Sequence, residues 1–352
     1  MKKPPRPKSG EPYGERRNRL SRLPSQLRLP RIGAGGLFFC LLLSGCAPRT
    51  ASAPTSPSPP ADPSSPADPS SPAGPPDTLA PGVVHRAIPT AADAGIDLVD
   101  IDLTQSHCRL TIQTRGIALS AGHVVGQAYT PHEWLTRTHG LMAINGGYFG
   151  AEDSTGRKEF VGLLVQKGRV RHAAPPLIGS GSPTIRRGQY VRSAFGLMPD
   201  GTPSIAWAAT EPSRPQALRS HRGPMRPDGS GWSVADAVGC GPTLISNGRI
   251  VVTQYQERLV SPGPEPRTFV AYDRVGGRPR HLVVGIASGS DFAALAAFLS
   301  RYFRRYDGTP AEAAMCLDGG ASTQMTYIVN HAAQSPRETG VTVPDALVLL
   351  PH

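Results

Sequence analysis

Residues 316–323 read Cys-Leu-Asp-Gly-Gly-Ala-Ser-Thr, and residues 143–149 read Ala-Ile-Asn-Gly-Gly-Tyr-Phe. In each stretch, apolar residues lead to one polar residue and then to a glycine pair. A buried strand that ends in a tight turn with accessible backbone N–H groups has this pattern. The stretch 316–323 adds a carboxylate at the strand end and two hydroxyls after the turn. Together, the two stretches predict a binding site for a polar, anionic or sugar-like ligand.

The first 45 residues have the features of an export signal. Basic residues precede an apolar run from Gly33 to Leu43, which is shorter than the roughly 20 residues of a membrane-spanning helix. Leu43-Ser44-Gly45-Cys46 resembles the lipobox of bacterial lipoproteins, in which the cysteine is acylated and becomes the mature N-terminus. We expect Cys46 to anchor the protein to a membrane of the bacterial cell envelope, facing the periplasm or the cell surface. The alternative is an ordinary signal peptide with a chance cysteine.

Removal of residues 1–45 changes the charge of the chain. The full sequence has 37 basic and 26 acidic side chains and a net charge of +11, and residues 1–45 carry ten of the basic and two of the acidic ones. The remainder has 27 and 24, a net charge of +3, so we do not expect a nucleic acid as partner. Residues 46–82 are Cys46 and a tether rich in Pro, Ser and Ala, which cannot bury a core.

Residues 83–352 are the predicted globular domain, and strand patterns dominate it. Residues 292–303 have apolar side chains at helical spacing, with Ser290 or Asp291 as the N-cap. Residues 209–235 lack periodicity and predict a long loop. We expect an α+β fold with mixed, largely antiparallel sheets and helices packed outside. The strand–helix–strand unit over 282–317 would supply one parallel strand pair.

A weak internal repeat is present within this domain. Residues 164–170 and 244–250 both read as strand–turn–strand hairpins, and each is followed by an Arg-hydroxyl pair that opens another hairpin, at Arg192 and at Arg267. The two copies are either a coincidence between common hairpins or a true repeat. A true repeat predicts two sheet halves related by a pseudo-twofold axis, with a cleft between them.

Three cysteines remain after export and lipidation: Cys108, Cys240 and Cys316. Their odd number allows at most one disulfide, and their apolar surroundings favour buried free thiols. No Cys/His cluster has the spacing of a zinc site, so we assign no metal ligand. No cofactor is evident, and the need for a divalent metal stays open.

The order of motifs over residues 95–350 resembles the phosphodiester glycosidase family. Asn145-Gly-Gly-Tyr-Phe is followed by a hairpin, Gly241-Pro-x-Leu, Arg267-Thr, an apolar strand, a helix and Leu317-Asp-Gly-Gly-x-Ser-Thr. The resemblance implies hydrolysis of the glycosidic bond of a sugar-1-phosphodiester, related to a glycan or to the cell envelope. Two departures stand out: Cys240 replaces a glycine of the family's Gly-Gly-Pro turn, and residues 285–288 lack the family's Asp-Gly. If that aspartate matters, Asp291 is the nearest substitute.

The chemistry that the resemblance implies assigns roles to individual residues. Asp318 is the candidate base or nucleophile, its alternative being to cap its own turn. Arg267 is the candidate phosphate clamp, with a structural ion pair as the alternative. Asn145 would orient a sugar hydroxyl or a phosphate oxygen, or simply form the turn. The remaining candidates are expected to contact substrate: Gly146, Gly147, Tyr148, Gly241, Thr268, Gly319, Gly320, Ser322 and Thr323. For Ser322 and Thr323, which could bind phosphate, the alternative is to cap a following helix.

A second class of function stays open from the sequence. The domain could bind an envelope glycan or polymer without turning it over, and the missing Asp-Gly favours this alternative slightly. No Gly-x-Ser-x-Gly elbow supports a serine hydrolase. Neither glycine turn matches a phosphate-binding loop or a dinucleotide fingerprint.

Overall fold

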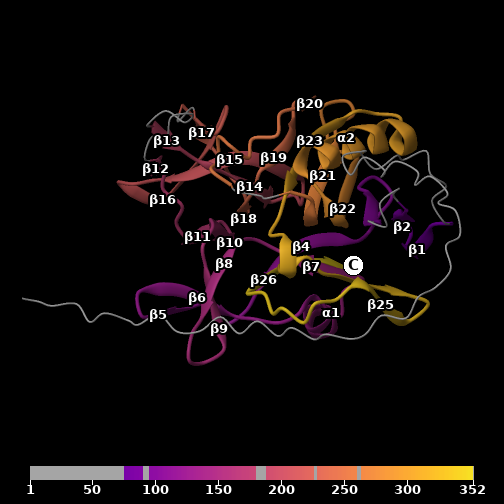
Figure 1. Ribbon diagram of the computed structural model, residues 1–352, viewed down its shortest axis with the longest axis horizontal. Coiled ribbons are helices and arrows are strands. Elements are labelled where there is room, and N and C mark those ends of the chain that lie inside the picture. Colours follow the sequence, from indigo (N-terminus) through magenta and orange to yellow (C-terminus); the bar gives the residue numbers. More distant parts are fainter. Residues whose placement is uncertain (1–74, 90–94, 180–187, 226–227, 260–262, 352) are drawn as a thin grey trace, which may run out of the picture. The chain divides into compact units, whose positions relative to one another are not determined.

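The computed structural model describes residues 75–89, 95–179, 188–225, 228–259 and 263–351 (Figure 1). The predicted signal, Cys46 and most of the predicted tether lie outside these residues. The described residues all belong to one compact unit, Pro60–His352.

β-Strands dominate the described residues, which contain only two α-helices, α1 (Pro131–Thr138) and α2 (Phe292–Tyr302). The predicted α+β fold with helices packed outside is therefore wrong: the protein is mostly β, and its cores lie largely between sheets. All the paired strands described are antiparallel. The expected parallel pair over 282–317 does not form, because another strand lies between the two that flank α2.

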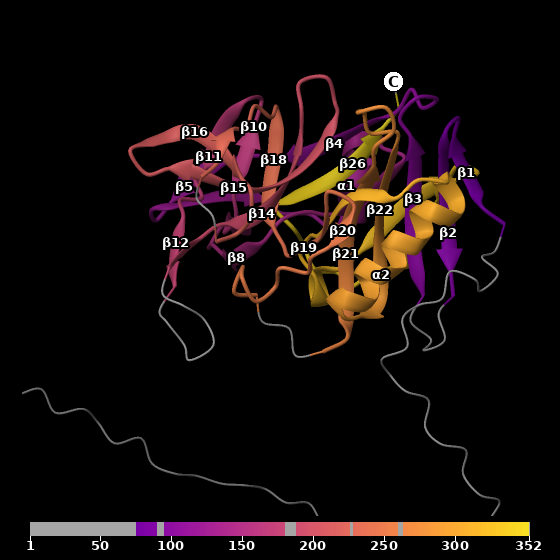
Figure 2. The ribbon, with the colours of Figure 1, turned by 90° about the horizontal axis from the view of Figure 1, so that it is seen from above.

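The largest sheet has eight strands. Their order is β1 (Asp77–Ala80), β2 (Val83–Ile88), β3 (Ile96–Asp102), β22 (His281–Ser290), β21 (Glu265–Asp273), β23 (Ala311–Cys316), β19 (Thr243–Ser246) and β20 (Arg249–Ile250). Strand β1 falls within the range predicted to be tether, and it pairs with β2. Figure 2 shows α2 lying along this sheet, where it contacts β19, β22 and β23.

A second sheet has seven strands. Their order is β11 (Arg169–His172), β10 (Leu164–Gln166), β18 (Asp236–Cys240), β14 (Arg192–Leu197), β15 (Pro203–Glu211), β16 (Arg214–His221) and β17 (Ser230–Gly231). The predicted loop over 209–235 is wrong for its first half, because β15 and β16 form a hairpin there. The hairpin escaped the sequence pattern because β16 is polar and half-exposed, without alternating apolar residues.

Three smaller sheets complete the unit. One has the order β25 (Ala332–Arg337), β24 (Met325–Val329), β7 (Met142–Asn145), β26 (Asp345–Leu350) and β4 (Arg109–Thr114). Another has β5 (Ala118–Ser120), β6 (His123–Gln127), β9 (Arg157–Phe160) and β8 (Phe149–Glu152). The last pairs β12 (Leu177–Gly179) with β13 (Gly188–Tyr190).

Both helices begin at side-chain caps. Thr130 and Glu133 form a capping box at α1, with Pro131 in its first turn. Asp291 caps α2 by accepting a hydrogen bond from the Ala294 N–H at 2.6 Å, as one of the two predicted N-caps. The predicted apolar stripe of α2 is buried, and a π-helical turn, Phe303–Asp307, continues the helix. No helix in the described part of the chain is long and apolar enough to cross a membrane.

The two copies of the proposed repeat have the same order of strands. The first runs β11-β10-β18-β14-β15 and the second β20-β19-β23-β21-β22. In each copy the last strand along the chain, β18 or β23, lies beside the first hairpin, β10-β11 or β19-β20. The ends of these last strands meet, since the Gly241 N–H donates to the Cys316 carbonyl at 3.1 Å. The turns after β18 and β23 therefore lie side by side where the two large sheets adjoin.

One buried carboxylate ties the two large sheets together. Glu257 follows β20 and is 0% exposed. It accepts hydrogen bonds from the Ser193 N–H and hydroxyl, the Trp207 indole, the Thr243 N–H and the Thr253 hydroxyl. Ser193 and Trp207 belong to the seven-stranded sheet, whereas Thr243 belongs to the eight-stranded one. Burial raises the pKa of Glu257, and these donors oppose the shift.

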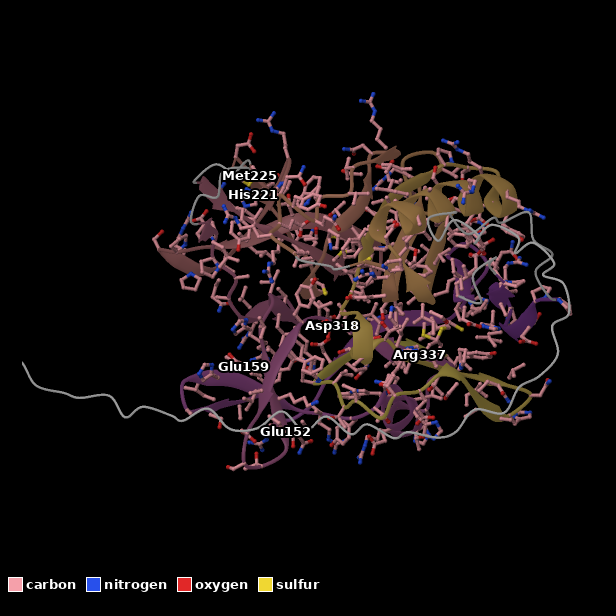
Figure 3. All side chains as sticks on the ribbon, viewed as in Figure 1. Glu152, Glu159, His221, Met225, Asp318 and Arg337 are labelled. Atoms are coloured by element: carbon pink, nitrogen blue, oxygen red, sulfur yellow. The ribbon has the colours of Figure 1, made fainter. Side chains whose placement is uncertain are left out.

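We expect Glu257→Gln to lower the free energy of unfolding by about 1–3 kcal/mol, because the new amide NH₂ would face a donor that now has an acceptor. Chemical denaturation of the purified protein measures this. Glu152→Gln is the matched control, since Glu152 is exposed at the edge of the molecule (Figure 3). Equal unfolding free energies for the two variants would contradict this role of Glu257.

Candidate active site

The candidate site is built around Asp318, the first residue of the turn that follows β23. Its N–H donates to the Gly146 carbonyl at 3.1 Å, and the preceding Leu317 N–H donates to the Thr268 carbonyl at 2.9 Å. The backbone around Asp318 is thus bonded to the other glycine-turn stretch, through Gly146, and to β21, through Thr268. Asp318 lies near the centre of the view in Figure 3.

The Asn145 side chain holds this turn in place through hydrogen bonds. Its amide NH₂ donates to the Asp318 carbonyl at 2.7 Å, and its amide oxygen accepts from the Thr268 hydroxyl at 2.8 Å and from the Gln324 N–H at 3.2 Å. Asn145 and Thr268 are both 0% exposed. Because the amide is used at both ends within the protein, Asn145 and Thr268 are positioning residues rather than groups that touch a ligand.

The Asp318 carboxyl is poised to change its charge near neutral pH. Burial raises the pKa of Asp318 to about 6, although hydrogen bonds from the Ser322 hydroxyl and the Gly319 N–H favour the ionised form. A carboxyl with such a pKa can act as a base or nucleophile at pH 7, where it is mostly ionised.

A second carboxyl, Asp345, lies beside the Asn145 turn and was not predicted from the sequence. It is 2% exposed and accepts a hydrogen bond from the Gly147 N–H at 2.6 Å. A Cβ atom at Gly146 would stand 1.8 Å from Asp345 Oδ1, so only glycine fits there. Burial and the nearby Asp318 charge raise the pKa of Asp345 to about 7. Asp345 thus holds the turn that follows Asn145. The one feature of the sequence that could have pointed to Asp345 is the isolated Pro-Asp pair before an apolar strand.

A cavity of about 290 Å³ opens in front of Asp318. The lining includes the predicted residues Tyr148, Gly241, Arg267, Asp318, Gly319 and Gly320, together with Arg192, Leu259, Glu265, Phe292 and Leu317. Gly146 and Gly147 are not on this lining. They support it instead, because a Cβ atom at Gly147 would lie 2.9 Å from the Gly239 carbonyl.

The two arginines of the repeat both line the cavity, but their guanidinium groups differ. Arg267 donates from Nε to the Ser290 carbonyl and from Nη2 to the Gly263 carbonyl, each at 3.0 Å, and Nη1 lies 3.3 Å from Glu265. Arg192 lies over the Tyr148 ring, and its buried Nε has no hydrogen-bond partner among the described residues. Arg192 therefore has more donor capacity available for an anion than the predicted Arg267.

Tyr148 and Gly241 lie together on the cavity lining. The Tyr148 hydroxyl donates to the Gly241 carbonyl at 2.7 Å. Gly241 has a φ of 144°, and a Cβ atom there would meet Glu257 Oε2 at 2.5 Å. Cys240 is not among the residues with positive φ, so the cysteine in this turn is compatible with an ordinary backbone. Cys108, Cys240 and Cys316 are all free thiols, and the last two are buried.

The remaining predicted residues have distinct roles. Ser322 bonds the Asp318 carboxyl, and Gly320 has the positive φ of 62° that the turn requires. Thr323 is 0% exposed and is not on the cavity lining. Asp291, the proposed substitute for the missing aspartate, is occupied as the cap of α2.

A model of the phosphodiester glycosidase family matches residues 138–350. The chain belongs to the phosphodiester glycosidase family. The match spans both glycine turns, Arg192, Arg267 and Asp345, and so contains the whole cavity described above. The predicted resemblance to this family is confirmed. No curated protein matches the chain.

Two solved structures show similarity to this chain. A hypothetical protein from Synechocystis has 15% sequence identity and a TM-score of 0.47, and the match covers 77% of this chain and 62% of that one. The chain thus spans less than two thirds of that protein. A protein of Burkholderia pseudomallei described as exported has 16% identity and a TM-score of 0.44, with 75% of each chain covered.

The raised pKa of Asp345 predicts how stability depends on pH. Between the ordinary pKa of an aspartate and about 7, the folded protein binds a proton that the unfolded chain does not. The Asp345 contribution to stability therefore falls as the pH rises through this range. Asp345→Asn keeps an acceptor for the Gly147 N–H, so we expect it to be more stable than wild type at pH 8, by on the order of 2 kcal/mol, with little difference near pH 4.

Thermal unfolding at several pH values measures this difference. Asp200→Asn is the control, and its stability relative to wild type should change with pH in the opposite direction. The reason is that a turn hydrogen bond from the Thr202 N–H lowers the pKa of the exposed Asp200. A difference between Asp345→Asn and wild type that stays constant from pH 5 to pH 8 would argue against the assignment.

Proposed function

We propose that this protein is a hydrolase that cleaves the glycosidic bond of a sugar-1-phosphodiester. The observation that carries the proposal is the presence of one titratable carboxyl, Asp318, and an available guanidinium, Arg192, on the lining of one cavity. Membership of the phosphodiester glycosidase family supports the same reaction class.

Hydrolysis at an anomeric carbon passes through an oxocarbenium-like state, and a carboxylate stabilises or attacks it. Asp318 either removes a proton from the attacking water or attacks the anomeric carbon itself. In the second case, water later hydrolyses the glycosyl ester. In both cases the bond from the anomeric carbon to the phosphate oxygen breaks, and that oxygen keeps the electron pair. The phosphomonoester is already a good leaving group, so its departure needs less help from a general acid.

The phosphate would lie against the two arginines. Arg192 has an Nε without a hydrogen-bond partner among the described residues, and Arg267 adds positive charge to the same lining. Glu265, the other carboxylate on the lining, is ion-paired with Arg267 and partly offsets its charge.

The cellular setting follows from the sequence alone. The apolar run and lipobox-like residues 43–46 support export and attachment to an envelope membrane through Cys46. A tether rich in Pro, Ser and Ala would hold the domain away from the membrane, within reach of an envelope glycan or a phosphodiester-linked polymer.

We expect Asp318→Asn to abolish hydrolysis of sugar-1-phosphodiesters while leaving the fold intact. A panel of such diesters, with sugar release measured for the protein without residues 1–45, tests this. Asp153→Asn, a half-buried turn carboxylate that is not on the cavity lining, is the control and should keep wild-type rates. The wild-type kcat/KM should fall as the pH drops through about 6, because protonated Asp318 is neither base nor nucleophile.

Turnover that survives in folded Asp318→Asn would contradict the assignment of Asp318. Saturable binding of a glycan or polymer without turnover of any diester would instead support the binding-only alternative, which the absence of the family's Asp-Gly favours.

A matched pair of arginine variants separates binding from structure. Arg192→Gln should lower kcat/KM by about 100-fold through lost phosphate contacts, with little change in melting temperature. Arg267→Gln should lower the melting temperature clearly, because it removes hydrogen bonds to two carbonyls. An unchanged kcat/KM in Arg192→Gln would exclude Arg192 from the phosphate site.

A further inference from the structure

A second polar cluster lies in the eight-stranded sheet, apart from the cavity lining described above. Asp100 comes from β3, His281 opens β22, and Asp307 ends the π-helical turn after α2. One ligand atom from each of these residues lies within 4.8 Å of the other two. The three side chains are mostly buried, with 5%, 15% and 3% of their surface exposed.

We propose that Asp100, His281 and Asp307 form a binding site for one divalent transition-metal ion, for which Zn²⁺ is the best fit. One imidazole nitrogen and two carboxylate oxygens form a ligand set that suits zinc better than calcium or magnesium, which prefer oxygen alone. A water molecule would complete a four-coordinate ion.

The distances within the cluster match such an ion. His281 Nδ1 lies 3.2 Å from Asp100 Oδ1 and 3.5 Å from Asp307 Oδ1. Tetrahedral ligands at about 2.0–2.2 Å from zinc are themselves separated by about 3.3–3.6 Å. A single Nδ1–H can point at one of the two oxygens, whereas a cation between them would be bound by both.

An independent observation points to a missing ligand. The Asp307 side chain is 97% buried, yet its Oδ2 has no hydrogen-bond partner among the described residues. A buried carboxylate oxygen without a partner is costly, and a bound ion or its water would satisfy it. The positive charge of Arg86 is felt by Asp307, but its guanidinium lies over the Tyr306 ring at 4.7 Å, and its Nε has no hydrogen-bond partner in the described part of the chain.

The surrounding residues orient the proposed ligands. The Tyr302 hydroxyl donates to Asp100 Oδ2 at 2.8 Å, which leaves Oδ1 for the ion. Asp273 Oδ1 accepts from the Arg280 and His281 N–H groups at 3.0 and 2.7 Å, which fixes the start of β22. Such outer contacts are typical of metal sites. A bound ion would tie β3, β22 and the end of the helical segment together.

Titration of the metal-free protein with Zn²⁺, followed by calorimetry and thermal unfolding, tests the proposal. We expect one tight site per chain and a higher melting temperature with zinc. Asp307→Asn, which keeps the shape of the side chain, should weaken binding by more than about 100-fold. Tyr302→Phe keeps all three ligands and should weaken binding by about tenfold. His123→Gln, which removes an exposed histidine, should leave the affinity unchanged.

Two results would overturn the proposal. One is the absence of a stoichiometric zinc site in the wild-type protein, and the other is equal affinity in wild type and Asp307→Asn. If Asp307→Asn does not fold, X-ray absorption of the zinc-loaded wild type decides instead. One nitrogen and two carboxylate oxygens from the protein support the site, and sulfur or several imidazole ligands would refute it.

Discussion

The hydrogen bonds of one buried amide, that of Asn145, hold the candidate active site in place. This side chain joins the end of β7 to the Asp318 carbonyl, the Thr268 hydroxyl and the Gln324 N–H, all of which come from distant parts of the chain. An amide has one acceptor and one donor group, and both are used here. Replacing the side chain would therefore leave several buried groups without partners, at the point where two sheets meet.

The cavity exists because two similar strand arrangements end side by side. Strands β18 and β23 close the two copies of the repeat, and the Gly241 N–H bonds the Cys316 carbonyl between them. Glu257 accepts from the Thr243 N–H just after the first turn, and Asn145 donates to the Asp318 carbonyl in the second. Asp345 in turn holds the backbone beside Asn145 through the Gly147 N–H. Asp318 is buried within this supported turn, and burial raises its pKa.

The sequence predicted the two glycine turns, the two hairpins and the capping of α2, because each depends on neighbouring residues. The α+β prediction failed because the described residues form many strands and only two α-helices, and polar strands such as β16 carry no alternating apolar pattern. The expected parallel pair failed because the apolar pattern over 282–317 does not reveal that β21 inserts between β22 and β23. Glu257, Asp345 and Arg192 were missed for a related reason. Glu257 and Asp345 are single polar residues without a local motif, and Arg192 was noted only as a member of the repeat. The role of each follows from contacts with residues far away in the chain. Arg267 was favoured over Arg192 because only the structure reveals which guanidinium is already occupied.

The central claim is that this protein breaks the bond between an anomeric carbon and a phosphate oxygen. Hydrolysis of a sugar-1-phosphodiester in ¹⁸O-labelled water, followed by mass spectrometry of both products, tests it most directly. Attack at the anomeric carbon, as proposed for Asp318, predicts that the label appears in the released sugar and not in the phosphomonoester. Label in the phosphomonoester would mean attack at phosphorus, and it would contradict the account.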